Sequence, residues 1–153
     1  KIRMVNKMKT LVGGSFKDKK ISILGLAFKP NTDDVRDSAS ITMIDAIKND
    51  DGLINAYDPV ANESMRKIFK EINYFNSWED ACKDVDAVAI LTEWNEFRSM
   101  SIKVLKKLMS KPILLDTRNI IDVKKLKANK FTFDNVGRGI LNNVNWKYWN
   151  KWR

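Results

Sequence analysis

The stretch that decides the fold is Ile21-Ser22-Ile23-Leu24, followed by Gly25-Leu26-Ala27-Phe28-Lys29-Pro30-Asn31-Thr32-Asp33-Asp34-Val35-Arg36-Asp37-Ser38. The first four residues are typical of a strand that is buried on both faces of a sheet. Beyond the loop, isoleucines at positions 41, 44 and 47 have the spacing of one helix face. The loop therefore joins a strand to a helix, and ligands of open α/β sheets bind at the carboxyl ends of strands. We expect it to bind an anionic ligand of the nucleotide type.

The same alternation of strands and helices continues along the chain. Strands are expected at residues 21–26, 53–57, 72–75, 87–91, 112–115 and 131–136. Helices are expected at residues 1–11, from Ser38 or Ser40 to about 49, at 62–70, from Ser77 onward, at 101–109 and at 123–128. This order predicts one α/β domain, a doubly wound, Rossmann-like parallel sheet in a three-layer sandwich, with a helical N-terminal arm. Residues 87–91 are the most hydrophobic strand and are expected at its centre.

The composition narrows the function without deciding it. The 153 residues carry a net charge of +9, which favours anionic partners, although a solvated basic surface explains it equally well. One cysteine excludes an intrachain disulfide and indicates a reducing, cytoplasmic setting. No run of about 18 apolar residues predicts a membrane span. Histidine is absent, so the commonest general base and the commonest metal ligand are missing, and no metal site is predicted. Any chemistry by this chain alone would need carboxylates, lysines or Cys82.

Three strand ends carry the candidate site residues. In the first loop, Lys29 and Arg36 offer charge-assisted donors for phosphates, and the acids at positions 33, 34 and 37 either orient these cations or form ordinary loop ion pairs. Arg118, at the end of a later strand, is expected to converge on the same edge, or else to pair with Asp116 or a loop acid. Glu93 is a candidate acid/base group, but with Glu96 it is better explained as a cap of the next helix.

Other features are weaker candidates. Cys82 lies on a short apolar-faced helix and is expected to be a buried structural thiol. The tryptophans at 146, 149 and 152 are expected to pack against this domain or a partner. Stacking of these rings on bases is the weaker interpretation, and with it a basic nucleic-acid-binding module is the alternative from another class. Gly25 stands alone, without the further glycines that a pyrophosphate turn requires, so this sheet is not the main dinucleotide-binding half of an enzyme.

Residues 25–38 resemble the C-terminal domain of the UDP-glucose/GDP-mannose dehydrogenases. Four further motifs follow in the family's order: Ala56-Tyr57-Asp58-Pro59, Ala87 to Trp94, Asp116-Thr117-Arg118-Asn119 and Val136-Gly137-Arg138-Gly139. The resemblance covers about residues 6 to 139, and the first run is similar to the UDP-glucose branch. The UDP-N-acetylmannosamine and GDP-mannose branches are the alternatives.

The resemblance implies an oxidoreductase that oxidises the C6 alcohol of a UDP-sugar in two hydride transfers to NAD. It implies that Phe28, Lys29 and Arg118 contact the UDP-sugar and that Arg36 contacts NAD, which is bound mainly by an N-terminal domain outside this chain. Residues 1–14 then end the central helix of a homodimer, residues 15–139 bind UDP-glucose or a related UDP-sugar, and residues 140–153 form a tail. Neither nucleic acid nor membrane is expected as a partner. The family's catalytic cysteine has no match here, so the chain alone is expected to be inactive.

Overall fold

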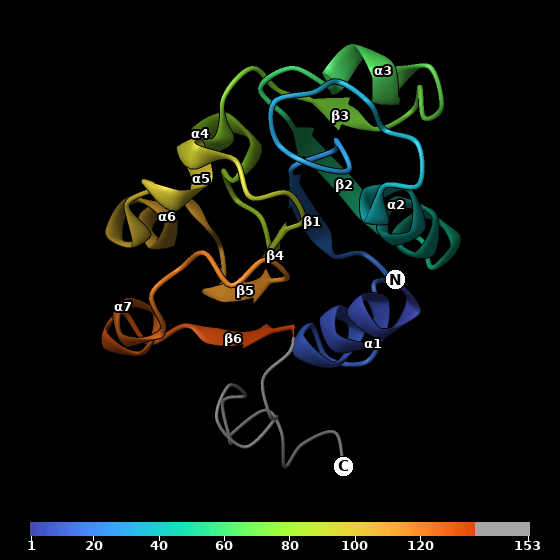
Figure 1. The fold of residues 1–153 in the computed structure, drawn as a ribbon. Coiled ribbons are helices and arrows are strands. Elements are labelled where there is room, and N and C mark those ends of the chain that lie inside the picture. Colours follow the sequence, from blue (N-terminus) through green and yellow to red (C-terminus); the bar gives the residue numbers. More distant parts are fainter. Residues whose placement is uncertain (137–153) are drawn as a thin grey trace.

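A central sheet organises the computed structural model, which describes residues 1–136 (Figure 1). Its strands are β1 (Lys20–Leu24), β2 (Leu53–Tyr57), β3 (Asn73–Tyr74), β4 (Ala87–Ile90), β5 (Ile113–Asp116) and β6 (Thr132–Asn135). The helices in this part of the chain are α1 (Ile2–Leu11), α2 (Ala39–Asn49), α3 (Asn62–Arg66), α4 (Trp78–Ala81), α5 (Asn95–Arg98), α6 (Ile102–Leu108) and α7 (Val123–Ala128). The predicted Gly137-Arg138-Gly139 motif and the tail at 140–153, with its tryptophans, lie outside the described residues.

The strands are all parallel and lie in the order β3-β2-β1-β4-β5-β6. The chain builds outward from β1 in one direction, through β2 to β3, and then in the other, through β4 to β6. At the carboxyl end of β1, Leu24 lies beside Tyr57 of β2 and Ile90 of β4. The edge formed by the loops that follow β1 and β4 is therefore the topological switch point, where this kind of sheet binds its ligand.

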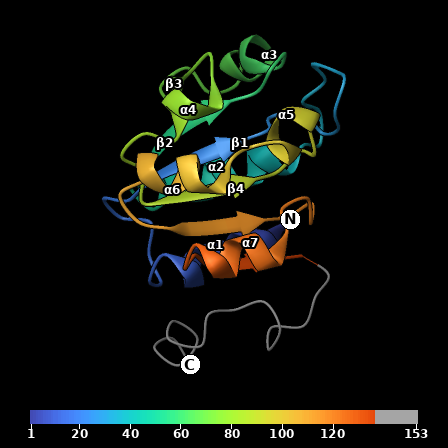
Figure 2. The ribbon, with the colours of Figure 1, turned by 90° about the vertical axis from the view of Figure 1, so that its left-hand side faces the viewer.

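Helices cover both faces of the sheet and complete the predicted three-layer sandwich. Figure 1 shows α1 and α2 on one face and α4 to α7 on the other, and Figure 2 brings α5, α6 and α7 toward the viewer. The buried side chains fall into two clusters, one for each face. Met8 of α1 and Ile44 of α2 belong to the first, and Phe97 of α5 and Leu126 of α7 belong to the second. The predicted fold class is confirmed.

Strand β4 has the position that its composition predicts. All four of its residues, Ala-Val-Ala-Ile, are buried, and it pairs with β1 on one side and β5 on the other. A continuous apolar strand of this kind fits only where helices cover both faces of a sheet. The prediction of a central strand at 87–91 is therefore confirmed.

Two predicted helix starts are also confirmed by their caps. The Ser38 side chain accepts a hydrogen bond from the Ser40 amide at the start of α2, and the Ser77 side chain accepts one from the Asp80 amide at the start of α4. A serine oxygen satisfies a backbone N–H that has no partner within the helix itself. Helix α2 therefore begins directly at the end of the loop after β1.

The predictions were wrong at two helices. The helix expected at 62–70 ends at Arg66, where the backbone tightens: the Ile68 amide donates to the Met65 carbonyl three residues back. The chain then turns, and Tyr74 donates its hydroxyl to the Phe69 carbonyl at 2.7 Å. Helix α5 was not predicted, because four residues are too short to show a helical period.

Candidate functional site

The loops after β1 and β4 are joined directly at the switch point. The Leu91 amide donates to the Leu24 carbonyl at 2.9 Å, and the Thr92 hydroxyl donates to the Ala27 carbonyl at 2.6 Å. Gly25 makes this approach possible. Its φ is +96°, and a Cβ at this position would lie 2.5 Å from the Thr92 Cβ. The side of Gly25 that a ligand could approach is therefore filled by the protein's own threonine.

Phe28 and Lys29 stand at the outer part of the loop after β1. Both are exposed, and the Lys29 ammonium lies 5.3 Å from the centre of the Phe28 ring. The Phe28 amide donates to the Asp34 carbonyl at 3.0 Å, which closes the loop behind these two side chains. Within residues 1–136, Lys29 has no ion pair with a carboxylate. The loop thus presents a cation beside an aromatic ring to the solvent.

Arg36, the second cation of the loop, is paired with Asp34. The Arg36 Nε donates to both carboxylate oxygens of Asp34, at 3.0 and 3.2 Å, and Nη2 donates to Oδ2 at 2.7 Å. The hydrogen bonds from Arg36 lower the pKa of Asp34 to about 2. Of the three acids considered as partners, Asp34 takes the role of orienting a cation. The Arg36 side chain remains 88% exposed, and Asp34 is its only hydrogen-bond partner within residues 1–136.

Arg118, after β5, is held by Glu93, after β4. Its Nε and Nη2 donate to the two oxygens of Glu93 at 2.7 and 2.9 Å, and this pair lowers the pKa of Glu93. The predicted alternatives, a pair with Asp116 or a loop acid, were wrong. Asp116 is buried, and it accepts hydrogen bonds from the amides of Arg118 and Ile121 instead. The arginine reaches across the switch-point edge to the neighbouring strand end.

The interpretation of Glu93 and Glu96 as helix caps was wrong for Glu93, whereas Glu96 does lie in the first turn of α5, where an acid suits the helix dipole. Helix α5 begins after Trp94 without a side-chain cap. Glu96 accepts the Tyr57 hydroxyl on both oxygens, at 2.7 and 3.0 Å. Burial, together with this carboxylate, raises the pKa of Tyr57. Glu93 therefore connects the ends of β4 and β5, and Glu96 connects α5 to the end of β2.

Asp58 is a residue of this edge that the sequence predictions treated only as the end of a strand. It is 2% exposed. Its oxygens accept five hydrogen bonds, from the amides of Leu26 (2.7 Å), Ala27 (3.0 Å), Val60 (2.9 Å) and Ala61 (2.9 Å) and from the indole N–H of Trp94 (3.1 Å). The signal in the sequence is an acid directly after an apolar strand, which is also the pattern of an ordinary turn.

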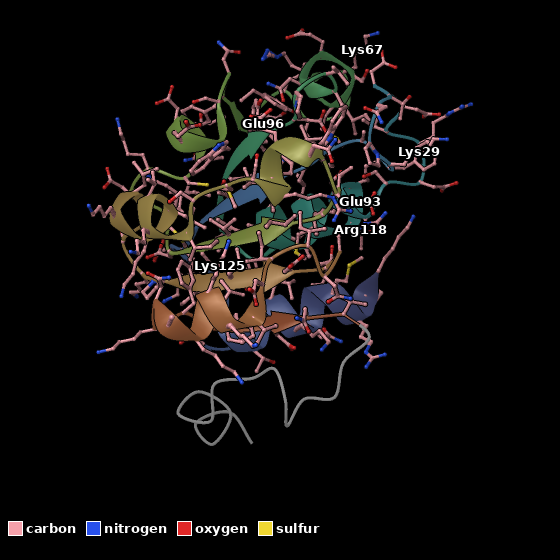
Figure 3. The ribbon with its side chains drawn as sticks, turned by 60° about the vertical axis from the view of Figure 1, so that its left-hand side comes forward. Lys29, Lys67, Glu93, Glu96, Arg118 and Lys125 are labelled. Carbon is pink, nitrogen blue, oxygen red and sulfur yellow. The ribbon has the colours of Figure 1, made fainter. Side chains whose placement is uncertain are left out.

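These contacts decide which predicted residues come together. Figure 3 shows Lys29, Glu93 and Arg118 at the same edge of the molecule, as the carboxyl ends of parallel strands require. Arg36 instead lines an open groove of about 560 Å³ between the loop and the region of α3, with Ser64, Lys67 and Ile68 on the far side. Neither Lys29 nor Arg118 lines this groove. The loop therefore presents Lys29 and Arg36 to different surroundings.

The residues present do not form a dinucleotide site at the β1 loop. The amides that would hold a pyrophosphate there already bond to protein oxygens: Gly25 to the Tyr57 carbonyl, Leu26 and Ala27 to Asp58, and Phe28 to the Asp34 carbonyl. NAD, which the resemblance implies, does not fit the loop in this arrangement. Within the described residues, no cluster of potential ligands could hold a metal ion.

Two further expectations concern parts away from this edge. Cys82 is buried, as predicted, and burial raises the pKa of its thiol to about 12. Its sulfur lies 3.5 Å from the Ser22 hydroxyl, inside the sheet–helix core. Residues 1–136 contain no helix that is long and apolar enough to cross a membrane.

Comparisons with known proteins give the family context of these residues. Residues 22–123 match the UDP-binding domain of the UDP-glucose/GDP-mannose dehydrogenase family. A UDP-glucose 6-dehydrogenase of Rickettsia conorii is 40% identical over 90% of this chain and 32% of its own length. The UDP-glucose 6-dehydrogenase TuaD of Bacillus subtilis is 34% identical over 90% of this chain and 30% of its own length. The chain thus spans about a third of the curated relatives that it matches.

Two solved structures show the same architecture. A UDP-D-ManNAc dehydrogenase of Pyrococcus horikoshii matches with a TM-score of 0.74 and 26% identity, over 90% of this chain and 31% of that one. A UDP-glucose dehydrogenase of Pyrobaculum islandicum matches with a TM-score of 0.66 and 25% identity, over 82% of this chain and 28% of that one.

Proposed function

The chain belongs to the UDP-glucose/GDP-mannose dehydrogenase family, and we propose that it is the UDP-sugar-binding part of a UDP-glucose 6-dehydrogenase. Such an enzyme oxidises UDP-glucose to UDP-glucuronate. The observation that carries the proposal is the exposed Phe28–Lys29 pair on the switch-point loop, whose cation has no carboxylate partner within residues 1–136. A nucleotide diphosphate supplies the missing anion, and an ammonium is a compact point charge suited to it.

Arg118 adds the second contact from the other side of the edge. Glu93 occupies its Nε and Nη2, while Nη1 makes no hydrogen bond to the described residues. The Nη1 donors are therefore available to a phosphate or a sugar hydroxyl, and Glu93 holds the plane of the guanidinium while they act. The Phe28 ring offers an apolar face to the base or the sugar, next to the Lys29 charge. These side chains bind and orient the substrate, and we assign no proton transfer to them.

NAD, when bound to the whole enzyme, would accept the hydride. We propose that a preceding domain holds it and that Arg36 reaches it from this chain, since the β1 loop has no amide left for a pyrophosphate. In the same proposal, residues 1–14 end the central helix of a homodimer. The family's catalytic cysteine has no match among these 153 residues, so we expect the isolated chain not to reduce NAD with UDP-glucose.

Titration calorimetry of the chain with UDP tests the proposal directly. GDP is the matched control, because the two ligands share the diphosphate and differ in the base. We expect UDP to bind, GDP to bind more weakly, and the double variant Lys29→Ala/Arg118→Ala to lose UDP binding. Binding of GDP in preference to UDP would move the chain to the GDP-mannose branch. Unchanged UDP affinity in the double variant would refute the assignment of the site.

A further inference from the structure

The amides of the loop after β1 bind a carboxylate from the residue that follows β2, at the place where sheets of this strand order hold a ligand phosphate. In a doubly wound sheet of order 3-2-1-4-5-6, the amides after the first strand and the start of the next helix receive the pyrophosphate of a dinucleotide. This chain has that strand order and that loop. The two amides directed at a common point are those of Leu26 and Ala27, and the atom at that point is Oδ2 of Asp58.

Asp58 is enclosed as a bound anion would be. Its Oδ2 accepts three hydrogen bonds, all from the β1 and β4 loops, and its Oδ1 accepts two from its own loop. No cation of the described residues forms an ion pair with it. N–H groups alone therefore balance its charge, as they do for a phosphate in a loop of backbone amides.

The start of α2 has several of its donors already occupied by the protein itself. Ser38 caps the helix through the Ser40 amide, and the Ser40 hydroxyl donates to the Leu26 carbonyl at 2.9 Å. The two serine hydroxyls lie 2.6 Å apart and are buried. The donors of this helix start are thus partly turned back onto the loop that Asp58 holds.

We propose that Asp58 is an internal anion that replaces the pyrophosphate of a dinucleotide and thereby sets which ligand this edge accepts. A second anion cannot occupy the place of the Asp58 carboxylate, so the phosphates of a nucleotide lie farther out, against Lys29 and Arg118. This part of the inference rests on the proposed function. The occupation of the amides by Asp58 does not depend on it.

Asp58 is also a positioning residue for both cations. Through Leu26 and Ala27 it holds the loop that carries Lys29. Through the indole of Trp94 it holds the loop that carries Glu93, the partner of Arg118. One carboxylate therefore sets the distance between the two halves of the anion site, although it contacts neither cation.

The first test follows the Leu26 and Ala27 amide signals by NMR during titration with inorganic pyrophosphate. In the unchanged chain we expect both signals to stay in place, because their acceptor is already present. In Asp58→Gly, which opens room for a small anion, we expect formate and phosphate to shift both signals. Signals that move with pyrophosphate in the unchanged chain, or that ignore formate and phosphate in a folded Asp58→Gly variant, would overturn the internal anion.

The second test measures UDP affinity. We expect Asp58→Asn to weaken UDP binding at least about tenfold, because a side-chain amide cannot accept from all five donors, and formate to restore part of the affinity in Asp58→Gly. Asp50→Asn is the matched control. Asp50 accepts hydrogen bonds from the Phe16 amide at 2.6 Å and from the Ser15 hydroxyl, next to the amino end of the sheet. Its substitution therefore removes a carboxylate that accepts backbone and side-chain hydrogen bonds at a place away from the proposed UDP site. UDP affinity in a folded Asp58→Asn variant equal to that of the control would overturn the positioning role. Absence of UDP binding in the unchanged chain would refute the proposed function, and the anion titration would still decide on Asp58.

Discussion

Lys29 and Arg118 lie at the same edge of the sheet, but their surroundings differ. Lys29 extends from a 14-residue loop, with its ammonium 5.3 Å from the centre of the Phe28 ring and no ion pair within residues 1–136. Arg118 follows its strand almost at once and is held on two atoms by Glu93, with its side chain 35% exposed. Lys29 therefore contributes a net charge to the edge, and Arg118 contributes directed donors whose charge is largely balanced. The ligand must gain attraction from one and orientation from the other.

The largest effect is expected for Arg118→Ala. The substitution removes the directed donors and also leaves the Glu93 carboxylate without its partner, facing the phosphates of the ligand. Loss of a charge-assisted hydrogen bond, together with this repulsion, should weaken UDP binding by about 100-fold. Calorimetric titration of the variant measures the effect.

The double variant Glu93→Gln/Arg118→Ala is the control for the repulsion. Glutamine keeps the shape of Glu93 without its charge, so we expect the double variant to regain about tenfold of the lost affinity. If it binds UDP no better than Arg118→Ala alone, Glu93 does not oppose the ligand, and the contrast between the two cations rests on donor geometry only.

A smaller effect is expected for Lys29→Ala. No described carboxylate is left unpaired by this change, so only the attraction to the phosphate is lost, about tenfold in UDP affinity. The effect should also shrink with added salt, since Lys29 is exposed. Lys17→Ala removes an exposed lysine that precedes β1, at the opposite end of the strand, and should leave the affinity nearly unchanged. Equal losses in the two lysine variants would show a general charge effect instead of a site.

The Glu93–Arg118 pair should have a small effect on stability with a defined pH dependence. Arg118 holds the pKa of Glu93 below its ordinary value of 4.5. A depressed pKa in the folded state means that the pair stabilises fully above about pH 4.5 and loses this contribution as the pH falls through the folded pKa. Because both side chains are partly exposed, we expect Glu93→Gln to cost about 0.5 kcal/mol at pH 7. Urea unfolding at pH 7 and near pH 3 compares the variant with the unchanged chain; a difference that stays constant between these conditions would contradict the pair's role.

The sequence predicts the fold better than the contacts of the site, and the residues show why. Burial can be predicted for Ile21-Ser22-Ile23-Leu24 and for the apolar strand at 87–91, because each residue of a central parallel strand must be apolar or small. The helix starts at Ser38 and Ser77 can also be predicted, because a serine N-cap forms its hydrogen bond with an amide two or three residues away. Glu93, the carboxylate partner of Arg118, and the three donors to Asp58 Oδ2 lie 25 to 36 residues away, and nothing in the local pattern distinguishes these from nearer acids or amides. Such pairings depend on strand order, which is known only once the sheet is assembled.

The smallest effect on UDP binding is expected for Arg36→Ala, and it tests whether the loop serves one ligand or two. Arg36 lines the groove beside α3 and is separated from the edge that Lys29 and Arg118 share. We expect UDP affinity to change by less than about twofold, while the pKa of Asp34 rises from about 2 toward its ordinary value because its guanidinium partner is gone. An NMR titration of the Asp34 carboxyl confirms that the pair was removed, so an unchanged UDP affinity is informative. In the whole enzyme, the same substitution should weaken NAD binding. A loss of UDP affinity comparable to that of Lys29→Ala would place both cations of the loop on the nucleotide sugar and remove the division between them.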